Sequence, residues 1–251
     1  MTSAAATYLA ECLLTEWDAR DITQSDNTAV ASWAKSAASV EGNALAQGTS
    51  NRRPTFRTGT YPYVSFDGTD DVIFASLVTD PEVVFMVVET TSDATLRAFF
   101  SMLNGGNYVW AYVSSGLILN PFVGTTPNTT PGETWNSAQN ATKQVIAFTA
   151  KSTSCGFMTH RTSAHALLTA KPSFAGQITV GGFNAGISYP FSGKIYYVAT
   201  AVGMSQEKVR HAMAVIAAEW GVTFDEPESA GGGNLVAAFQ HGFDIGRSGA
   251  L

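Results

Sequence analysis

The stretch Val83-Val84-Phe85-Met86-Val87-Val88 decides the fold class of this chain of 251 residues. All six side chains are apolar, so a strand built from them needs cover on both of its faces. Two stacked sheets can give a central strand such cover. The turn residues Thr79-Asp80-Pro81 precede the stretch and mark where this strand begins.

Further strand-like runs alternate with turn residues between residues 63 and 202. Gly68-Thr69-Asp70, Asn104-Gly105-Gly106 and Ser115-Gly116 are three of the turns that separate them. Short strands at this spacing predict an all-β sandwich or barrel. The runs are Tyr63–Phe66, Asp71–Ser76, Val83–Glu89, Ala98–Leu103, Tyr108–Ser114, Leu117–Val123, Gln144–Ala150, Cys155–His160, Gln177–Gly182 and Lys194–Val202.

One amphipathic helix is predicted near residues 205–220, after the last strand. Ser205 suits its N-cap, and Gly221 suits a left-handed cap at its C-terminal end. Apolar residues recur at i, i+4, i+7 and i+11, which places them on one stripe of a helix. This stripe predicts that the helix packs against the sandwich. It consists of Val209, Met213, Ile216 and Trp220.

Composition and charge exclude two classes of partner. The 14 basic and 20 acidic residues give a net charge of −6, and the basic ones are scattered, so we expect no nucleic-acid partner. No apolar run approaches the roughly 20 residues of a membrane span, so we expect no membrane partner. Residues 1–10 lack the pattern of a secretory signal, which indicates synthesis in a cytoplasm.

The chain is predicted to have three parts: a lead-in arm at 1–16, a sandwich domain at 17–224, and an arm at 225–251. The second arm follows Gly231-Gly232-Gly233, and a flexible linker followed by apolar residues can dock on another subunit. A disordered tail is the alternative. The apolar residues expected to dock are Leu235, Val236, Phe239, Phe243 and Ile245.

Several segments resemble a known family when they are taken in order. They are Trp17-Asp18-Ala19-Arg20-Asp21-Ile22, Val64-Ser65-Phe66-Asp67-Gly68-Thr69-Asp70-Asp71, Phe191-Ser192-Gly193-Lys194-Ile195-Tyr196 and Trp220-Gly221-Val222. The chain resembles the laminin-G-like branch of the concanavalin A-like lectin/glucanase superfamily, which occurs in bacteriophage virion proteins and bacterial surface proteins. The resemblance implies an all-β, two-sheet antiparallel jelly-roll sandwich with one C-terminal helix. This fold hosts lectins, hydrolases, adhesion modules and virion parts alike.

The sequence predicts no catalytic site. Glycosidases of this fold carry alternating Glu and Asp residues on one strand, because two carboxylates must flank the scissile bond. No such strand occurs here, and Glu226-Pro227-Glu228 lies in the tail. There is no Gly-x-Ser-x-Gly motif, and no set of four His and Cys residues has the spacing of a zinc site. We therefore expect a protein that is not an enzyme.

The turn that contains Asp67, Asp70 and Asp71 is the one candidate for a metal site. The family resemblance implies a calcium ion on the rim of the sandwich, and carboxylate oxygens suit this hard cation. An Asp-rich turn without an ion is the alternative.

Two functions are compared. The first is a virion structural protein, made in the host cytoplasm, that decorates or cements a capsid or joins a tail. It would act by binding other virion proteins and copies of itself in a homo-oligomer. The alternative is a carbohydrate-binding module of a phage receptor-binding or bacterial surface protein, in which exposed aromatic rings stack on a glycan. The candidate stacking residues are Tyr108, Trp110, Tyr112, Trp135 and Tyr189.

Overall fold

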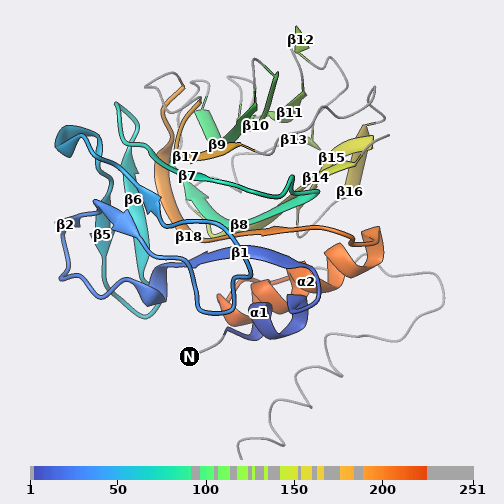
Figure 1. The fold of residues 1–251 in the computed structure, drawn as a ribbon, viewed down its shortest axis with the longest axis horizontal. Helices are drawn as coiled ribbons and strands as arrows, with labels where there is room; N and C mark the ends of the chain where they lie inside the picture. The colour runs from blue at the N-terminus through green and yellow to red at the C-terminus, as the bar shows by residue number, and fades with distance from the viewer. Residues whose placement is uncertain are drawn as a thin grey trace, which may run out of the picture.

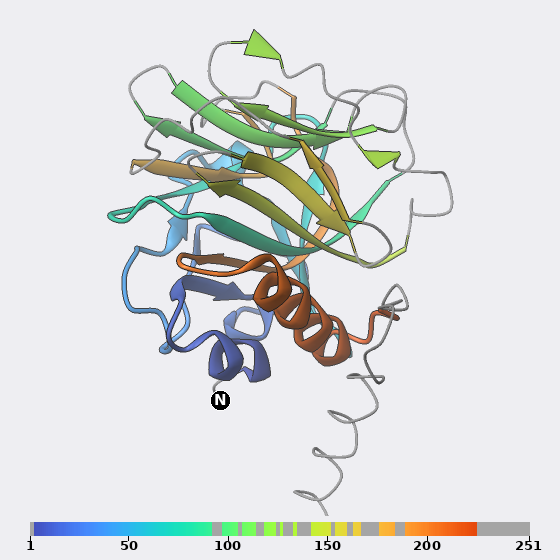
Figure 2. The ribbon, with the colours of Figure 1, turned by 90° about the vertical axis from the view of Figure 1, so that its right-hand side faces the viewer.

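In the computed structural model, two antiparallel sheets stack face to face, and two helices pack outside one of them (Figure 1). Figure 2 shows these layers from the side, with α1 and α2 on the face of one sheet that points away from the other. This architecture confirms the predicted sandwich with its C-terminal helix. The structure describes residues 3–91, 97–104, 107–113, 118–123, 126–127, 133–134, 142–151, 154–159, 163–166, 176–183 and 189–224.

Sheet A carries the helices. Its strand order is β16-β15-β14-β8-β18-β6-β5-β2, and β1 pairs with β18 beyond the part that β6 covers. The strands are β1 (Leu13–Asp18), β2 (Thr28–Ala29), β5 (Thr55–Arg57), β6 (Tyr63–Asp67), β8 (Val83–Thr90), β14 (Gln144–Lys151), β15 (Ser154–Thr159), β16 (Ser163–Ala166) and β18 (Ser192–Ala201).

Sheet B forms the opposite layer. Its order is β12-β11-β10-β9-β17-β7-β4-β3, and β13 pairs with β11. Short 3-10 turns at Ala19–Asp21 and Ser50–Arg52 lie between early strands. The strands are β3 (Ser32–Trp33), β4 (Leu45–Ala46), β7 (Ile73–Ser76), β9 (Arg97–Asn104), β10 (Asn107–Val113), β11 (Ile118–Val123), β12 (Thr126–Pro127), β13 (Glu133–Thr134) and β17 (Gln177–Val180).

Strand β8 lies in the middle of sheet A, and its residues 83–88 are buried on both faces, as predicted. Val84 is opposite Phe148, whose ring packs edge-on against Phe100 of sheet B, so this face points into the sandwich. Alternation along the strand turns Phe85 and Val87 to the other face. There the cover comes from helix α2 and not from a second sheet.

Helix α2 (Gln206–Glu219) confirms the predicted element. The Ser205 hydroxyl accepts a hydrogen bond from the Lys208 N–H at 3.1 Å, as an N-cap does. All four residues of the predicted stripe are fully buried. Gly221 follows the helix with φ of +64°, the left-handed conformation expected of a C-terminal cap.

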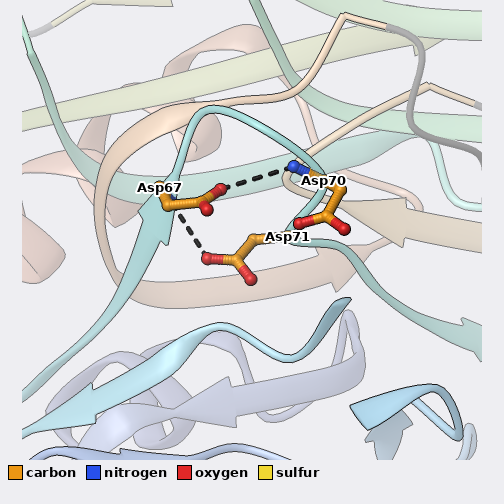
Figure 3. A group of neighbouring side chains, drawn as sticks. All are labelled: Asp67, Asp70 and Asp71. Atoms are coloured by element: carbon orange, nitrogen blue, oxygen red, sulfur yellow. Dashed lines mark hydrogen bonds between the residues drawn. The ribbon is translucent and has the colours of Figure 1, made fainter. Parts of the chain in front are cut away.

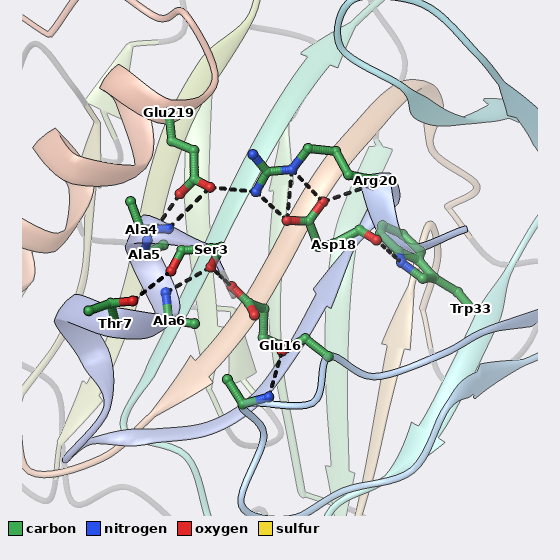
Figure 4. Close-up of polar contacts among 12 residues, drawn as sticks. Ser3, Ala4, Ala5, Ala6, Thr7, Glu16, Asp18, Arg20, Trp33 and Glu219 are labelled. Carbon is green, nitrogen blue, oxygen red and sulfur yellow. Dashed lines mark hydrogen bonds and ion pairs between the residues drawn. The ribbon is translucent and has the colours of Figure 1, made fainter. Parts of the chain in front are cut away.

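The N-terminal residues form the short helix α1 (Ala4–Leu9) before β1, and Figure 4 shows how it is held. The Glu219 carboxylate accepts hydrogen bonds from the N–H groups of Ala4 (3.2 Å) and Ala5 (3.0 Å). The Ser3 hydroxyl donates to the buried Glu16 carboxylate at 2.5 Å, and burial raises the pKa of Glu16. Residues 3–16, expected to be a lead-in arm, thus pack on sheet A and on α2, while the domain boundary at residue 17 stays a prediction.

The arm at 225–251 and its five apolar residues lie outside the described residues. Within the described part of the chain, no helix is long and apolar enough to cross a bilayer.

Trp17 and Trp33 are fully buried, which agrees with the packing role that aromatic residues of this size have in a core.

Candidate functional site

The turn between β6 and β7 gathers three carboxylates (Figure 3). Asp67 accepts hydrogen bonds with Oδ1 from the N–H groups of Thr69 (2.7 Å) and Asp70 (3.4 Å). Asp71 Oδ2 accepts from the Asp67 N–H at 2.9 Å. One oxygen from each of Asp67, Asp70 and Asp71 lies within 4.8 Å of the others, so the turn concentrates negative charge.

Asp71 is the buried member of this group, since only 7% of the residue is exposed. Burial raises the pKa of Asp71 to about 6, and the negative charges of Asp67 and Asp70 add to the rise. The hydrogen bond from the Asp67 N–H acts in the opposite direction. Asp71 therefore changes its charge near pH 6, above the usual range of an aspartate carboxyl group.

Asp71→Asn is expected to remove a pH dependence of stability between about pH 4 and pH 6. Because the folded pKa lies above the unfolded value, Asp71 stabilises the fold below about pH 4, and this contribution is lost as pH rises through about 6. Relative to wild type, the variant should gain about 1–2 kcal/mol of unfolding free energy between these pH values. Urea unfolding of both proteins from pH 4 to pH 8 measures this, and a constant difference would refute the assignment.

Arg97, at the start of β9, joins the Asp turn to the segment before β18. Its Nη1 donates to the carbonyl oxygens of Gly68 and Pro190, both at 2.8 Å. The next residue, Ala98, donates its N–H to the Tyr189 carbonyl oxygen at 3.0 Å. Two segments more than 100 residues apart in the chain therefore meet at one edge of the sandwich.

Tyr189 is the exposed aromatic residue of this edge, with 42% of its surface accessible. Its φ of +54° lies in the left-handed region, which costs a bulky residue about 1–2 kcal/mol. Its ring meets that of Phe183 edge-on at 6.2 Å. Strain of this kind persists where the surrounding structure imposes it, and it is often found at functional sites. We call the group formed by Asp67, Asp70, Asp71, Arg97 and Tyr189 the Tyr189 rim.

The rim fits the implied calcium ion poorly. Calcium takes six to eight oxygen ligands. Oxygens of Asp67 and Asp71 are already acceptors for N–H groups of the turn, and the Gly68 carbonyl accepts from the Arg97 cation. Among the described residues, the three carboxylates of the turn therefore offer fewer ligands than this ion takes, and calcium binding stays a prediction.

The positions of the other predicted stacking residues relative to this rim lie outside what the structure describes. Tyr108, Trp110 and Tyr112 belong to β10 in sheet B, and their side chains lie outside the described part of the structure. Trp135 also lies outside it. Arg97 was not predicted, because a single arginine at the start of a strand gives no signal in the sequence.

Solved structures of other proteins are similar to this chain in fold. No family model and no curated protein sequence matches the chain. A sialidase from Trypanosoma rangeli, solved in complex with sialic acid, is similar over 87% of this chain and 38% of its own, at 11% identity and a TM-score of 0.60. This similarity shows a shared fold, a sandwich of two antiparallel sheets. The chain spans less than half of that sialidase.

Two further solved structures are similar to the chain at lower TM-scores. Domain 4 of an extracellular arabinanase from Geobacillus stearothermophilus, in complex with arabinotriose, has 14% identity and a TM-score of 0.49, over 67% of this chain and 82% of that one. A sialidase carbohydrate-binding module from Ruminococcus gnavus, bound to α2,3-sialyllactose, has 14% identity and a TM-score of 0.44, over 55% and 83%. Identities this low concern the fold alone.

Proposed function

We propose that this concanavalin A-like domain is a non-enzymatic carbohydrate-binding module that holds a glycan at the Tyr189 rim. The observation that carries the proposal is the exposed side chain of Tyr189, whose backbone is left-handed and whose neighbour Pro190 is bound through its carbonyl by the same Arg97 that binds Gly68 of the Asp turn. The face of an aromatic ring packs on the apolar face of a sugar. Carboxylates and a guanidinium group supply the acceptors and donors that orient its hydroxyl groups.

The arrangement of the carboxylates favours binding over hydrolysis. A glycosidase needs an acid and a second carboxylate on opposite sides of the scissile bond, about 5 Å or more apart. At the rim, the three aspartates share one tight turn, and Asp67 is held by two N–H groups of that turn. Such a group can accept hydrogen bonds from one edge of a sugar but does not flank a bond.

Of the two functions compared from the sequence, carbohydrate binding is the better supported. The similar structures include a sialidase part and carbohydrate-binding domains, and none of them points to a bacteriophage. A shared fold leaves the ligand of this chain to be argued from its own residues. Part of the support for the virion hypothesis came from the apolar arm at 225–251, which lies outside the described residues.

A glycan array tests the proposal. We expect the wild-type protein to bind at least one class of glycan and Tyr189→Gly to lose that signal. Glycine adopts positive φ without strain, so the substitution removes the ring while relieving the backbone. Tyr189→Phe keeps the ring and should keep the signal. If the wild-type protein binds no glycan on the array, this result would count against carbohydrate binding. If Tyr189→Gly gives the same signal as wild type, the glycan does not bind at the Tyr189 rim.

A further inference from the structure

A second cluster of aromatic side chains lies on the outer face of sheet A, where helix α2 ends. The ring of Tyr196 on β18 lies 5.4 Å from that of Tyr63 on β6 and 5.9 Å from that of Trp220. Tyr61, just before β6, lies 6.1 Å from Trp220. Trp220 and Tyr196 are buried, whereas Tyr61 and Tyr63 are partly exposed. The outer two rings therefore offer aromatic surface to solvent.

Two lysines lie over these rings. Lys143 Nζ is 3.5 Å from the ring centre of Tyr61 and 4.9 Å from that of Tyr196. It also donates a hydrogen bond to the Trp220 carbonyl oxygen at 2.7 Å. Lys194 Nζ is 5.1 Å from the ring centre of Tyr63. Both ammonium groups are thus placed by cation–π contacts on the same patch of the sheet.

The patch holds more positive than negative charge. Its one carboxylate, Glu89, accepts from Lys194 Nζ at 2.5 Å with Oε1 and from the Tyr196 hydroxyl at 2.8 Å with Oε2. Within the described part of the chain, Lys143 has no carboxylate at ion-pair distance. Burial lowers the pKa of Lys143, and the charge of Lys194 adds to this, while Glu89 opposes it. The Lys143 ammonium group is therefore partly removed from water, and it has no ion-pair partner among the described residues.

We propose that this cluster, formed by Tyr61, Tyr63, Lys143, Lys194 and Tyr196, binds an acidic sugar. The sugar ring would pack on the parts of Tyr61 and Tyr63 that the lysines leave exposed, and its carboxylate would pair with Lys143. The side chain of Lys194 is 36% exposed and adds a second positive charge at the same place. The site is separate from the Tyr189 rim and opposite to it in charge. It therefore goes beyond the proposed function and does not depend on it.

Titration calorimetry with trigalacturonate and its methyl ester tests this site, because esterification removes the charge of each carboxyl group and adds only one methyl group to it. We expect wild-type protein to bind the acid at least about tenfold more tightly than the ester, and this preference to shrink as sodium chloride is raised. Lys143→Met should abolish the preference. Lys35→Met, the same change at an exposed lysine outside the cluster, should leave it intact.

Lys143 also donates a hydrogen bond to the Trp220 carbonyl oxygen at the end of α2, so Lys143→Met removes this contact together with the charge. Lys143→Arg therefore serves as a second variant. It keeps the positive charge and should keep most of the preference even if the helix end shifts. Equal affinity of wild-type protein for acid and ester, absence of binding to both, or an unchanged preference in Lys143→Met would each overturn the proposal. The array is read out by the loss of signal in Tyr189→Gly and the calorimetry by the loss of acid preference in Lys143→Met, so the two proposals can fail separately.

Discussion

Replacing Gly193 with alanine is expected to lower the free energy of unfolding by about 3–5 kcal/mol. An added Cβ would lie 2.2 Å from the Glu89 carbonyl oxygen and 3.0 Å from the Thr90 Cα. Both are backbone atoms of β8, the central strand beside β18, and they cannot rotate away as a side chain can. The φ of +149° adds strain for any residue with a Cβ. Urea unfolding at neutral pH measures the loss.

Gly203→Ala is the matched control for this prediction. Gly203 also has a positive φ, of +66°, but a Cβ there would meet no atom within 4 Å. Its substitution should cost only the conformational penalty, about 1–2 kcal/mol. If both variants lose the same stability, the close approach of β18 and β8 is not what constrains Gly193.

Trp220→Ala is expected to cost about 3–5 kcal/mol of unfolding free energy. Trp220 is fully buried at the end of α2, its ring lies 6.2 Å from that of Tyr197 on β18, and the Arg20 guanidinium lies 4.6 Å from its centre. Removing it leaves a cavity between the helix and sheet A and loosens the contacts of Arg20, which is paired with Asp18 and Glu219. Chemical unfolding measures the change.

Trp220→Phe separates loss of volume from loss of the aromatic contacts. It keeps a ring in the same place, and we expect it to lose roughly half as much as the alanine variant. A loss below about 1 kcal/mol in Trp220→Ala would mean that α2 contributes little to the sandwich, contrary to the burial of its whole apolar stripe.

The strands and the helix that could be predicted from the sequence are those with a clear apolar pattern. Residues 83–88 and the stripe that ends at Trp220 are recognisable directly, because every position in them is apolar or periodic. Strands of two residues, such as Thr28–Ala29 and Ser32–Trp33, are too short to show a pattern. Strand Leu13–Asp18 was missed because it buries Glu16 and Asp18, two charged residues that break the apolar pattern and are paired with Ser3 and Arg20.

The candidate sites could be predicted only in part. Asp67, Asp70, Asp71 and Tyr189 were named from their residue types, but as members of two unrelated groups. Arg97 connects them through carbonyls 29 and 93 residues away in the chain, and no local pattern reveals such a link. The lysine cluster was missed for the same reason, since Lys143 and Tyr61 meet only after the sheet has formed.

The most direct test of the central claim is a calorimetric titration of the best glycan from the array into wild-type protein and Tyr189→Gly, with thermal unfolding of both. The account predicts that the variant binds about 30-fold more weakly, because a ring that anchors a ligand contributes about 2 kcal/mol. Its melting temperature should be equal or higher, since glycine accepts the backbone conformation of residue 189. Equal affinity in the two proteins would contradict glycan binding at the Tyr189 rim.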